Sequence, residues 1–306
     1  MSAVIQTWGL HKRYGQHPAL ESLDLEVEEG SVFGLIGPNG AGKTTTLRIL
    51  LDIIRPTAGK VSVLGANPRV GGARLRQQIG YVPGELRLQG RLRGRDLLER
   101  LAQISGPVPP GAIEQLAERL GADLSRPVRT LSKGNKQKLG LIQAFMHQPK
   151  LLVLDEPTSG LDPLVQREFL GLVREARSAG QTVLLSSHVL SEIQQAADQV
   201  AVLSEGKIVA EGPVASLRLA SIRRVRATVT GWNEANLREA LGSLPEVTEL
   251  SLVPDAEQVR VSLTWRGEID PLIRTLTAGT IRDLTVEEPD LEESVLSLYQ
   301  PEGEGL

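Results

Sequence analysis

Residues 37–44 read Gly37-Pro38-Asn39-Gly40-Ala41-Gly42-Lys43-Thr44 and match the pattern G-x-x-x-x-G-K-T at every fixed position. In such a loop the glycines let successive backbone N–H groups point at one phosphate chain, while Lys43 reaches the β- and γ-phosphates and Thr44 offers its hydroxyl to Mg²⁺. The apolar run 32–36 predicts the buried strand that must precede the loop. A helix predicted over 43–51 would direct the positive N-terminal end of its dipole at the bound phosphates. The segment predicts a nucleoside triphosphate site, but by itself it does not distinguish kinases, GTPases, ATPases and motors.

Two acidic residues follow a second apolar run. Residues 151–154 are Leu-Leu-Val-Leu and lead directly into Asp155 and Glu156. Parallel strands deliver such side chains to the carboxyl edge of a sheet, where α/β proteins bind their ligands. Adjacent acids after an apolar run are commonly only a solvated strand end, but the phosphate loop upstream favours a functional role. We therefore expect Asp155 to hold Mg²⁺ through water and Glu156 to polarise an attacking water.

Three further motifs surround these carboxylates. Leu131-Ser132-Lys133-Gly134-Asn135 precedes them and opens a predicted helix over 136–146. Ser159-Gly160-Leu161-Asp162 follows them, and another apolar run, 182–186, leads into Ser187-His188. A lone histidine after a strand is more often structural, yet this one stands at the sheet edge that binds ligands.

The order and spacing of these motifs closely resemble those of the nucleotide-binding subunit of ABC transporters, over roughly residues 1–220. By this resemblance, residues 131–135 are the signature motif, residues 159–162 are the D-loop and His188 is the switch histidine. The resemblance also makes Tyr14 the aromatic residue that stacks on adenine, although a tyrosine near an edge strand can simply cap the core. The active form of such a subunit is a dimer.

The resemblance assigns a role to each residue of the expected site. The catalytic residues would be Glu156, as general base, and His188, which contacts the γ-phosphate. In the dimer, ATP on the phosphate loop of one copy would be covered by the signature motif of the other. The expected ATP-binding residues are Tyr14, Gly37, Pro38, Asn39, Gly40, Ala41, Gly42, Lys43, Thr44, Thr45, Ser132, Gly134 and Asp162, and the expected Mg²⁺ ligands are Thr44 and Asp155.

Two motifs depart from the family's commonest pattern. In the signature, Lys133 replaces the usual glycine and Asn135 the usual glutamine. The lysine either adds a charge near the γ-phosphate or points to solvent. Gly84 stands where the family usually has a glutamine that touches Mg²⁺, and Glu85 follows it.

Two explanations of this second departure compete. Either Glu85 substitutes for the missing glutamine, or the metal keeps an extra water, as Mg²⁺ readily does. In the second case, coupling to the membrane subunit runs through the loop backbone and nearby arginines. We favour the second, because a shift of one residue in an extended segment turns the side chain to the opposite face. The arginines are Arg87, Arg91, Arg93 and Arg95.

Length and composition fit one large and one small domain. The chain has 306 residues, of which 41% are hydrophobic and 3% aromatic, so its cores must be built from Leu, Val, Ile and Ala. The absence of cysteine excludes disulfides and thiolate metal sites. No uncharged stretch approaches the ~20 residues that span a bilayer, so any membrane path is expected on another polypeptide. Residues 1–220 carry a net charge of +5 and residues 221–306 one of −8.

The predicted fold class is α/β. We expect a P-loop ABC ATPase domain over 1–220, with a helical subdomain at about 84–147, and a small α+β accessory domain over 221–306. The second domain is predicted as β-α-β-β-α-β, the ferredoxin-like order, followed by one more helix. The six elements are predicted at Val225–Val229, Glu234–Leu244, Val247–Leu252, Val259–Leu263, Ile269–Leu276 and Ile281–Val286, and the last helix at Leu291–Tyr299.

The sequence therefore predicts the ATP-hydrolysing subunit of an ABC transporter, most simply of an exporter. By the resemblance it would be a peripheral homodimer at the cytoplasmic face of the cell membrane, bound to a separately encoded integral-membrane permease, with ATP and Mg²⁺ as cofactors and no nucleic acid. The alternative is a soluble ABC-type ATPase that acts on nucleic acid or ribosomes. The single cassette and the lack of a long coiled-coil insertion argue against it. A small-molecule kinase would need neither signature nor switch histidine.

Overall fold

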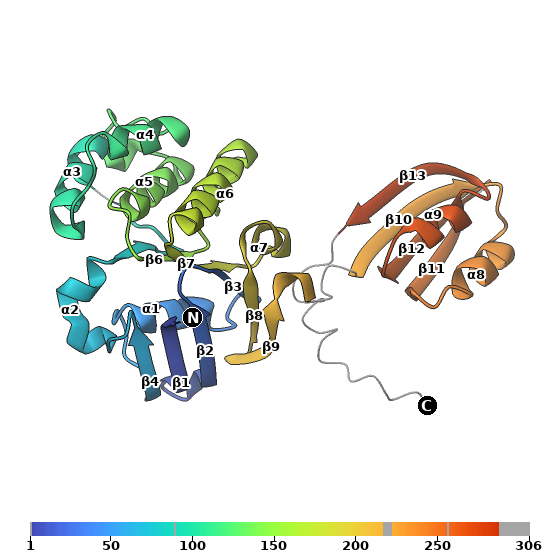
Figure 1. Ribbon diagram of the computed structural model, residues 1–306. Coiled ribbons are helices and arrows are strands. Elements are labelled where there is room, and N and C mark those ends of the chain that lie inside the picture. Colours follow the sequence, from blue (N-terminus) through green and yellow to red (C-terminus); the bar gives the residue numbers. More distant parts are fainter. Residues whose placement is uncertain (1, 89, 217–221, 256, 288–306) are drawn as a thin grey trace. The chain divides into compact units, whose positions relative to one another are not determined.

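The computed structural model describes residues 2–88, 90–216, 222–255 and 257–287 (Figure 1). Within it the chain separates into two compact units, Met1–Val214 and the part that begins at Ala215. Each unit has an apolar core of its own.

The centre of the first unit is a six-stranded sheet in the order β5-β6-β7-β3-β8-β9. Its first five strands are parallel, and only β9 is antiparallel to its neighbour. Every residue of β3, β6 and β7 is buried, which explains why these strands are largely apolar, with polar side chains only at the ends of β6 and β7. The strands are β3 (Val32–Ile36), β5 (Ile79–Val82), β6 (Leu151–Asp155), β7 (Thr182–Ser187), β8 (Gln199–Ser204) and β9 (Lys207–Pro213).

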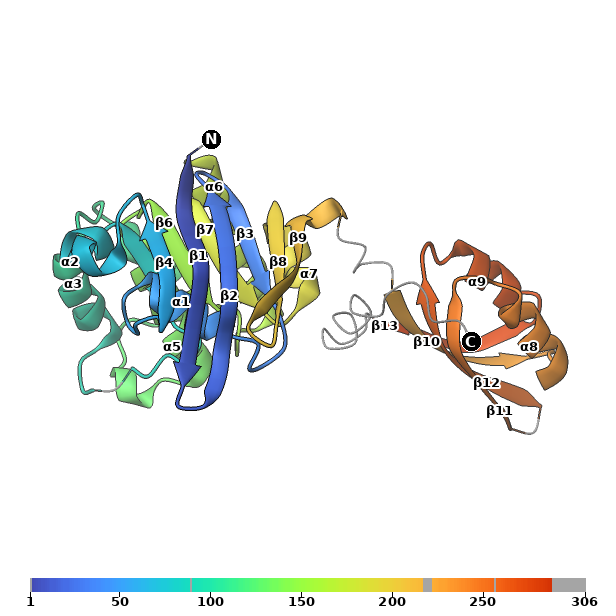
Figure 2. The same cartoon turned by 90° about the horizontal axis from the view of Figure 1, so that it is seen from below.

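A second, antiparallel sheet in the order β2-β1-β4 faces the first one. It consists of β1 (Ala3–Tyr14), β2 (His17–Glu28) and β4 (Ala58–Val63). In Figure 2 these strands lie in front of the parallel sheet, and one apolar core joins side chains from both. Helix α1 (Lys43–Leu50) contacts β2, β4 and β6, so it is held between the sheets. This position fixes the loop that precedes α1.

Six more α-helices are described in the first unit: α2 (Pro68–Arg76), α3 (Gly94–Ser105), α4 (Ala112–Arg119), α5 (Lys133–Phe145), α6 (Pro163–Ser178) and α7 (Leu190–Ala196). Both α3 and α4 pack against α5, while α6 packs against β7. Helix α5 begins three residues before its predicted start, because the Ser132 hydroxyl accepts a hydrogen bond from the Asn135 N–H and caps the helix.

The second unit is a four-stranded antiparallel sheet, in the order β11-β12-β10-β13, with two helices. Its elements follow the predicted β-α-β-β-α-β order, although α8 ends at Gly242, before the predicted Leu244. The helix predicted over 291–299 lies outside the described residues. The six elements are β10 (Ile222–Thr230), α8 (Glu234–Gly242), β11 (Val247–Asp255), β12 (Gln258–Arg266), α9 (Asp270–Leu276) and β13 (Thr280–Glu287).

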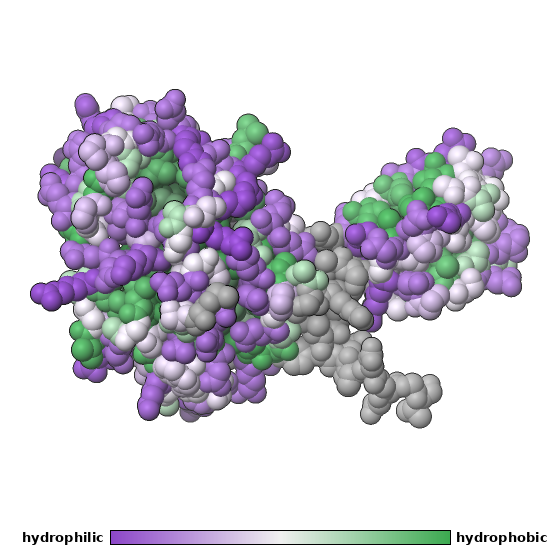
Figure 3. Space-filling model, viewed as in Figure 1, coloured by the Kyte–Doolittle hydropathy of each residue, from purple (hydrophilic) through white to green (hydrophobic). Residues whose placement is uncertain are grey.

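Hydrophilic side chains cover most of the face of each unit seen in Figure 3, with apolar residues in small patches. None of the helices that the structure describes is long and apolar enough to cross a lipid bilayer.

Candidate active site

The phosphate loop connects β3 to α1 and lines a pocket of about 130 Å³. Glycine is required at two of its positions by close backbone contacts. A Cβ on Gly37 would lie 2.1 Å from the Leu203 carbonyl oxygen, and one on Gly42, which has a φ of +110°, would lie 2.7 Å from the Ala19 carbonyl oxygen. The pocket is lined by Pro38, Asn39, Gly40, Ala41, Gly42, Lys43, Thr44, Thr45 and Glu156.

The buried ammonium group of Lys43 lies across this loop. Its Nζ donates hydrogen bonds to the carbonyl oxygens of Gly37, at 2.6 Å, and Pro38, at 3.1 Å. The same Nζ is 3.7 Å from Glu156 Oε1. Burial lowers the pKa of Lys43, and the negative charge of Glu156 opposes that shift. A phosphate chain in the loop would supply this ammonium with further negative charge.

Glu156 lies between Lys43 and His188. Its Oε2 is 3.3 Å from His188 Nδ1, so one carboxylate meets a side chain from α1 and another from the segment after β7. The backbone of Glu156 has a φ of +46°, a conformation that non-glycine residues adopt rarely. The Glu156 N–H donates to the carbonyl oxygen and to the hydroxyl of Ser186, each at 3.2 Å, which stabilises this conformation.

The carboxylate of Asp155 is buried at the end of β6, and its two oxygens differ. Its Oδ1 accepts a 2.6 Å hydrogen bond from the Ser186 hydroxyl, whereas its Oδ2 is buried with no hydrogen-bond partner among the described residues. A Cβ on Gly84 would lie only 3.1 Å from Oδ2, so a side chain at this position would crowd the oxygen and glycine does not. An unpartnered carboxylate oxygen at the end of β6 and the hydroxyl of Thr44 on the phosphate loop are both hard oxygen donors, the kind that Mg²⁺ prefers.

The signature motif contacts the D-loop of the same chain. A Cβ on Gly134 would lie 2.5 Å from the Gly160 carbonyl oxygen, and the exposed Lys133 donates from Nζ to Ser159 Oγ at 3.2 Å. The ammonium of Lys133 is thus hydrogen-bonded to the D-loop of its own chain. Neither Ser132 nor Gly134 lines the phosphate-loop pocket.

Asp162 and Tyr14 make local contacts in the structure. Asp162 Oδ1 accepts hydrogen bonds from the N–H groups of Leu164 and Val165 and so caps α6. Tyr14 is 47% exposed, with the Nζ of Lys12 at 4.9 Å from its ring centroid. The expected contacts of both residues with the nucleotide stay predictions.

Three polar residues around the carboxylates were missed at the sequence level. Besides Ser186, buried Gln137 donates to the Pro157 carbonyl oxygen at 3.0 Å and so fixes the chain just after Glu156. Ser187 donates to Glu192 at 2.8 Å and accepts from the Val189 N–H, which shapes the segment that carries His188. The sequence did show two serines at the end of an apolar run. It could not show that they are buried beside the carboxylates, because that depends on segments distant in the chain.

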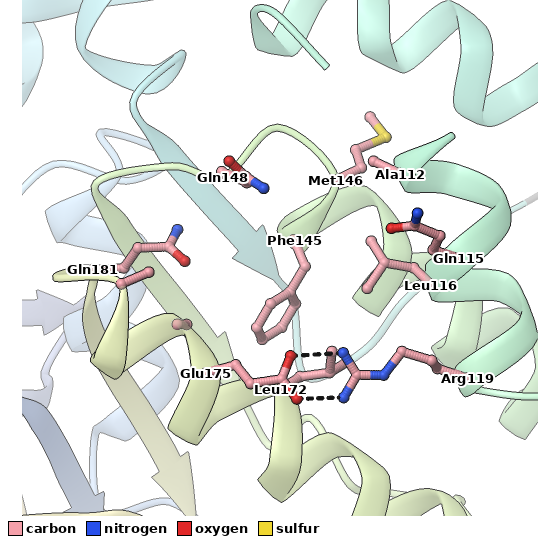
Figure 4. A pocket seen from close by; sticks show the side chains of 12 residues that line it. Ala112, Gln115, Leu116, Arg119, Phe145, Met146, Gln148, Leu172, Glu175 and Gln181 are labelled. Atoms are coloured by element: carbon pink, nitrogen blue, oxygen red, sulfur yellow. Dashed lines mark hydrogen bonds and ion pairs between the residues drawn. The ribbon is translucent and has the colours of Figure 1, made fainter. Parts of the chain in front are cut away.

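A larger pocket of about 390 Å³ lies away from these motifs, between α4, α5 and α6 (Figure 4). Arg119 crosses it, with two hydrogen bonds of 2.7 Å to Glu175 and a third, of 2.6 Å, to Glu168. These bonds raise the pKa of Arg119, chiefly through Glu175. The arginine therefore ties α4 to α6.

Comparisons with known proteins agree with this geometry. A family model described as ABC transporter matches residues 20–159. The daunorubicin resistance ATP-binding protein DrrA3 of Streptomyces coeruleorubidus is 35% identical over 95% of this chain and 94% of its own length. The Nod factor export ATP-binding protein I of Cupriavidus metallidurans is 35% identical over 82% of this chain and 84% of its own. A solved structure of an ATP binding subunit of an ABC transporter superposes with a TM-score of 0.65 at 30% identity, over 70% of this chain and 92% of that one.

Proposed function

This chain belongs to the ABC transporter family, as an ATP-binding protein, and on that premise we propose that it hydrolyses ATP to power export through a membrane subunit. The observation that carries the proposal is the position of Glu156, which lines the phosphate-loop pocket between Lys43 and His188. A nucleophilic water would thus stand next to the transferred phosphate and a carboxylate base.

In this proposal each side chain of the site has a separate role in phosphoryl transfer. The loop N–H groups and Lys43 bind the phosphates and neutralise their charge. Glu156 accepts the proton of the attacking water, and His188 contacts the γ-phosphate while it orients that carboxylate. Thr44 and Asp155 would hold Mg²⁺, which, when bound, screens the negative charge that develops on the phosphates.

We assign the signature motif that covers each bound ATP to a second copy of the chain. Supporting this, Ser132 and Gly134 stand outside the phosphate-loop pocket of their own chain. Ser132 is exposed at the N-terminus of α5, where its hydroxyl and the helix end favour a bound phosphate. Closure of the homodimer on ATP and its release after hydrolysis would then move the bound membrane subunits.

The direction of transport and the partner rest on the relatives. One of them is named for Nod factor export and another for daunorubicin resistance, and both names fit outward transport. We propose a separately encoded integral-membrane permease as the partner, which would hold this chain at the cytoplasmic face of the membrane. The relatives do not favour the alternative of a soluble ATPase that acts on nucleic acid or ribosomes.

Two measurements test this function. The purified chain should hydrolyse ATP in the presence of Mg²⁺ but not in EDTA. The tagged chain, coexpressed with a polytopic membrane protein from a neighbouring reading frame, should be recovered in the membrane fraction and purify with that protein in detergent. Recovery outside the membrane fraction with every such candidate would contradict the transporter role.

Glu85→Gln is expected to change the basal Mg²⁺-dependent ATPase rate by less than about threefold, or roughly 0.7 kcal/mol in the barrier. In the structure the exposed carboxylate of Glu85 pairs with Arg87 at 2.8 Å. Stimulation by the membrane partner should nevertheless be disturbed, and Arg87→Gln should disturb it similarly. A hundredfold fall in the basal rate with a raised Mg²⁺ requirement would place Glu85 at the metal instead.

A chain that ends at Ala220 is expected to stay folded and to bind ATP. We assign residues 221–306 to a separate accessory domain, and among the described residues the apolar cluster that joins the two sheets of the first unit includes none beyond Ile208. The phosphate loop, both carboxylates and the predicted helical subdomain at 84–147 are all retained. Thermal melting and ATP titration of the truncated chain check this, and we expect changes only in dimer stability or regulation. Aggregation, or loss of ATP binding, would show that the tail completes the first core.

A further inference from the structure

We propose, on the basis of the function above, that Ser186 is a positioning residue that orients Asp155 for Mg²⁺ and holds the backbone of Glu156. Ser186 is fully buried in β7, directly beside Asp155 of β6 in the parallel ladder. It touches neither the loop pocket nor solvent, so its effect on the reaction must pass through these two residues.

The Ser186 hydroxyl has one donor and two acceptor positions, and the structure uses both functions. Its hydrogen goes to Asp155 Oδ1 at 2.6 Å, a short distance typical of a bond to a charged oxygen. Its oxygen accepts the Glu156 N–H at 3.2 Å. One buried hydroxyl therefore connects the two carboxylate residues of the site.

The bond to Asp155 sets which oxygen is free. Because Oδ1 is engaged by Ser186, the rotation of the carboxylate is fixed and Oδ2 lies next to Gly84. Oδ2 accepts no hydrogen bond from the described part of the chain. Groups that orient a metal ligand in this way typically change metal affinity or activity 10- to 100-fold when they are removed. We expect the same of Ser186.

The bond to Glu156 is partly duplicated. The Glu156 N–H also donates to the Ser186 carbonyl oxygen at 3.2 Å, and a side-chain substitution leaves that acceptor in place. Loss of the hydroxyl should therefore affect metal binding strongly and the catalytic step weakly. A large effect on metal affinity with a small effect on kcat would distinguish a positioning role from a general loss of structure.

The test measures metal affinity directly, in the full chain. Mn²⁺ replaces Mg²⁺, a non-hydrolysable ATP analogue fills the site, and electron paramagnetic resonance gives the Kd of Mn²⁺. Ser186→Ala should raise this Kd about tenfold or more. Binding of the analogue in EDTA should stay within about threefold, as should kcat at saturating Mn²⁺. Ser186→Thr keeps the hydroxyl and should restore the wild-type Kd.

Thr182→Val is the matched control. Thr182 is buried in the same strand, and its hydroxyl oxygen accepts the Gly30 N–H at 2.9 Å, at the end of β7 far from the carboxylates. This variant loses a buried hydroxyl without touching Asp155, so it should melt at a lower temperature but bind Mn²⁺ like the wild type. If Ser186→Ala does not fold, Ser186→Cys, with a weak donor of similar shape, should give an intermediate rise in Kd.

An unchanged Kd in Ser186→Ala, or an equal rise in Thr182→Val, would overturn the positioning role alone. A wild-type chain that binds neither the analogue nor Mn²⁺ would overturn the proposed function and the inference that rests on it.

Discussion

Exchange of Glu156 for glutamine is expected to slow ATP hydrolysis at least about a hundredfold while ATP still binds, because a positioned base contributes ~10²–10⁴-fold. Glutamine has the size of glutamate but cannot accept the proton of the attacking water. The side chain would still lie between Lys43 and His188, so the phosphate loop should keep its geometry. Closure on ATP without hydrolysis should also trap the dimer.

The measurements are kcat with Mg²⁺-ATP, the Kd of ATP and the fraction of dimer in size-exclusion chromatography with ATP. Glu85→Gln is the matched control, since it makes the same chemical change at an exposed glutamate outside the pocket. Lys43→Ala should behave differently and weaken ATP binding itself, because its ammonium lies within the loop. Near-normal turnover of Glu156→Gln would remove this residue as the base.

The centre of the fold was predictable because its sequence signals are local. A phosphate loop needs glycines, a lysine and a hydroxyl at fixed spacing, and the buried strands β3, β6 and β7 are each built on a short apolar run. The alternating strands and short helices of the second unit are equally local, and their order matched the prediction. Fold class and family follow from such signals together with the order of the motifs.

The missed features depend on segments that are distant in the chain. The antiparallel pair β1 and β2 contains several register shifts, which interrupt the regular alternation of a strand. Ser186 acts on Asp155, 31 residues away, and Lys133 bonds to Ser159, 26 residues away. Helix α6 was missed although Asp162 and Pro163 are a typical helix start, so its signal was present but not used.

Ser132→Arg is expected to abolish closure over ATP bound to the other copy, while ATP binding by the isolated monomer survives. Ser132 is exposed at the N-terminus of α5, and an arginine there would fill the space that the partner's ATP needs. The substitution also removes the helix cap, a loss of about 1 kcal/mol, so thermal melting must show that the variant is folded. Ser132→Asn keeps a capping side chain and serves as the control for this loss.

Mixed dimers make the test decisive. In the proposed dimer, each ATP site consists of the phosphate loop of one copy and the signature motif of the other. When one copy carries Lys43→Ala and the other Ser132→Arg, both substitutions therefore fall in the same site, and the second site keeps an intact loop and an intact signature. When one copy carries both substitutions and its partner is wild type, each site has one lesion and neither should close. We therefore expect one ATP occluded per dimer in the first arrangement and none in the second. The opposite result would mean that each chain covers its own nucleotide, because the loop and the signature of one chain would then form a single site.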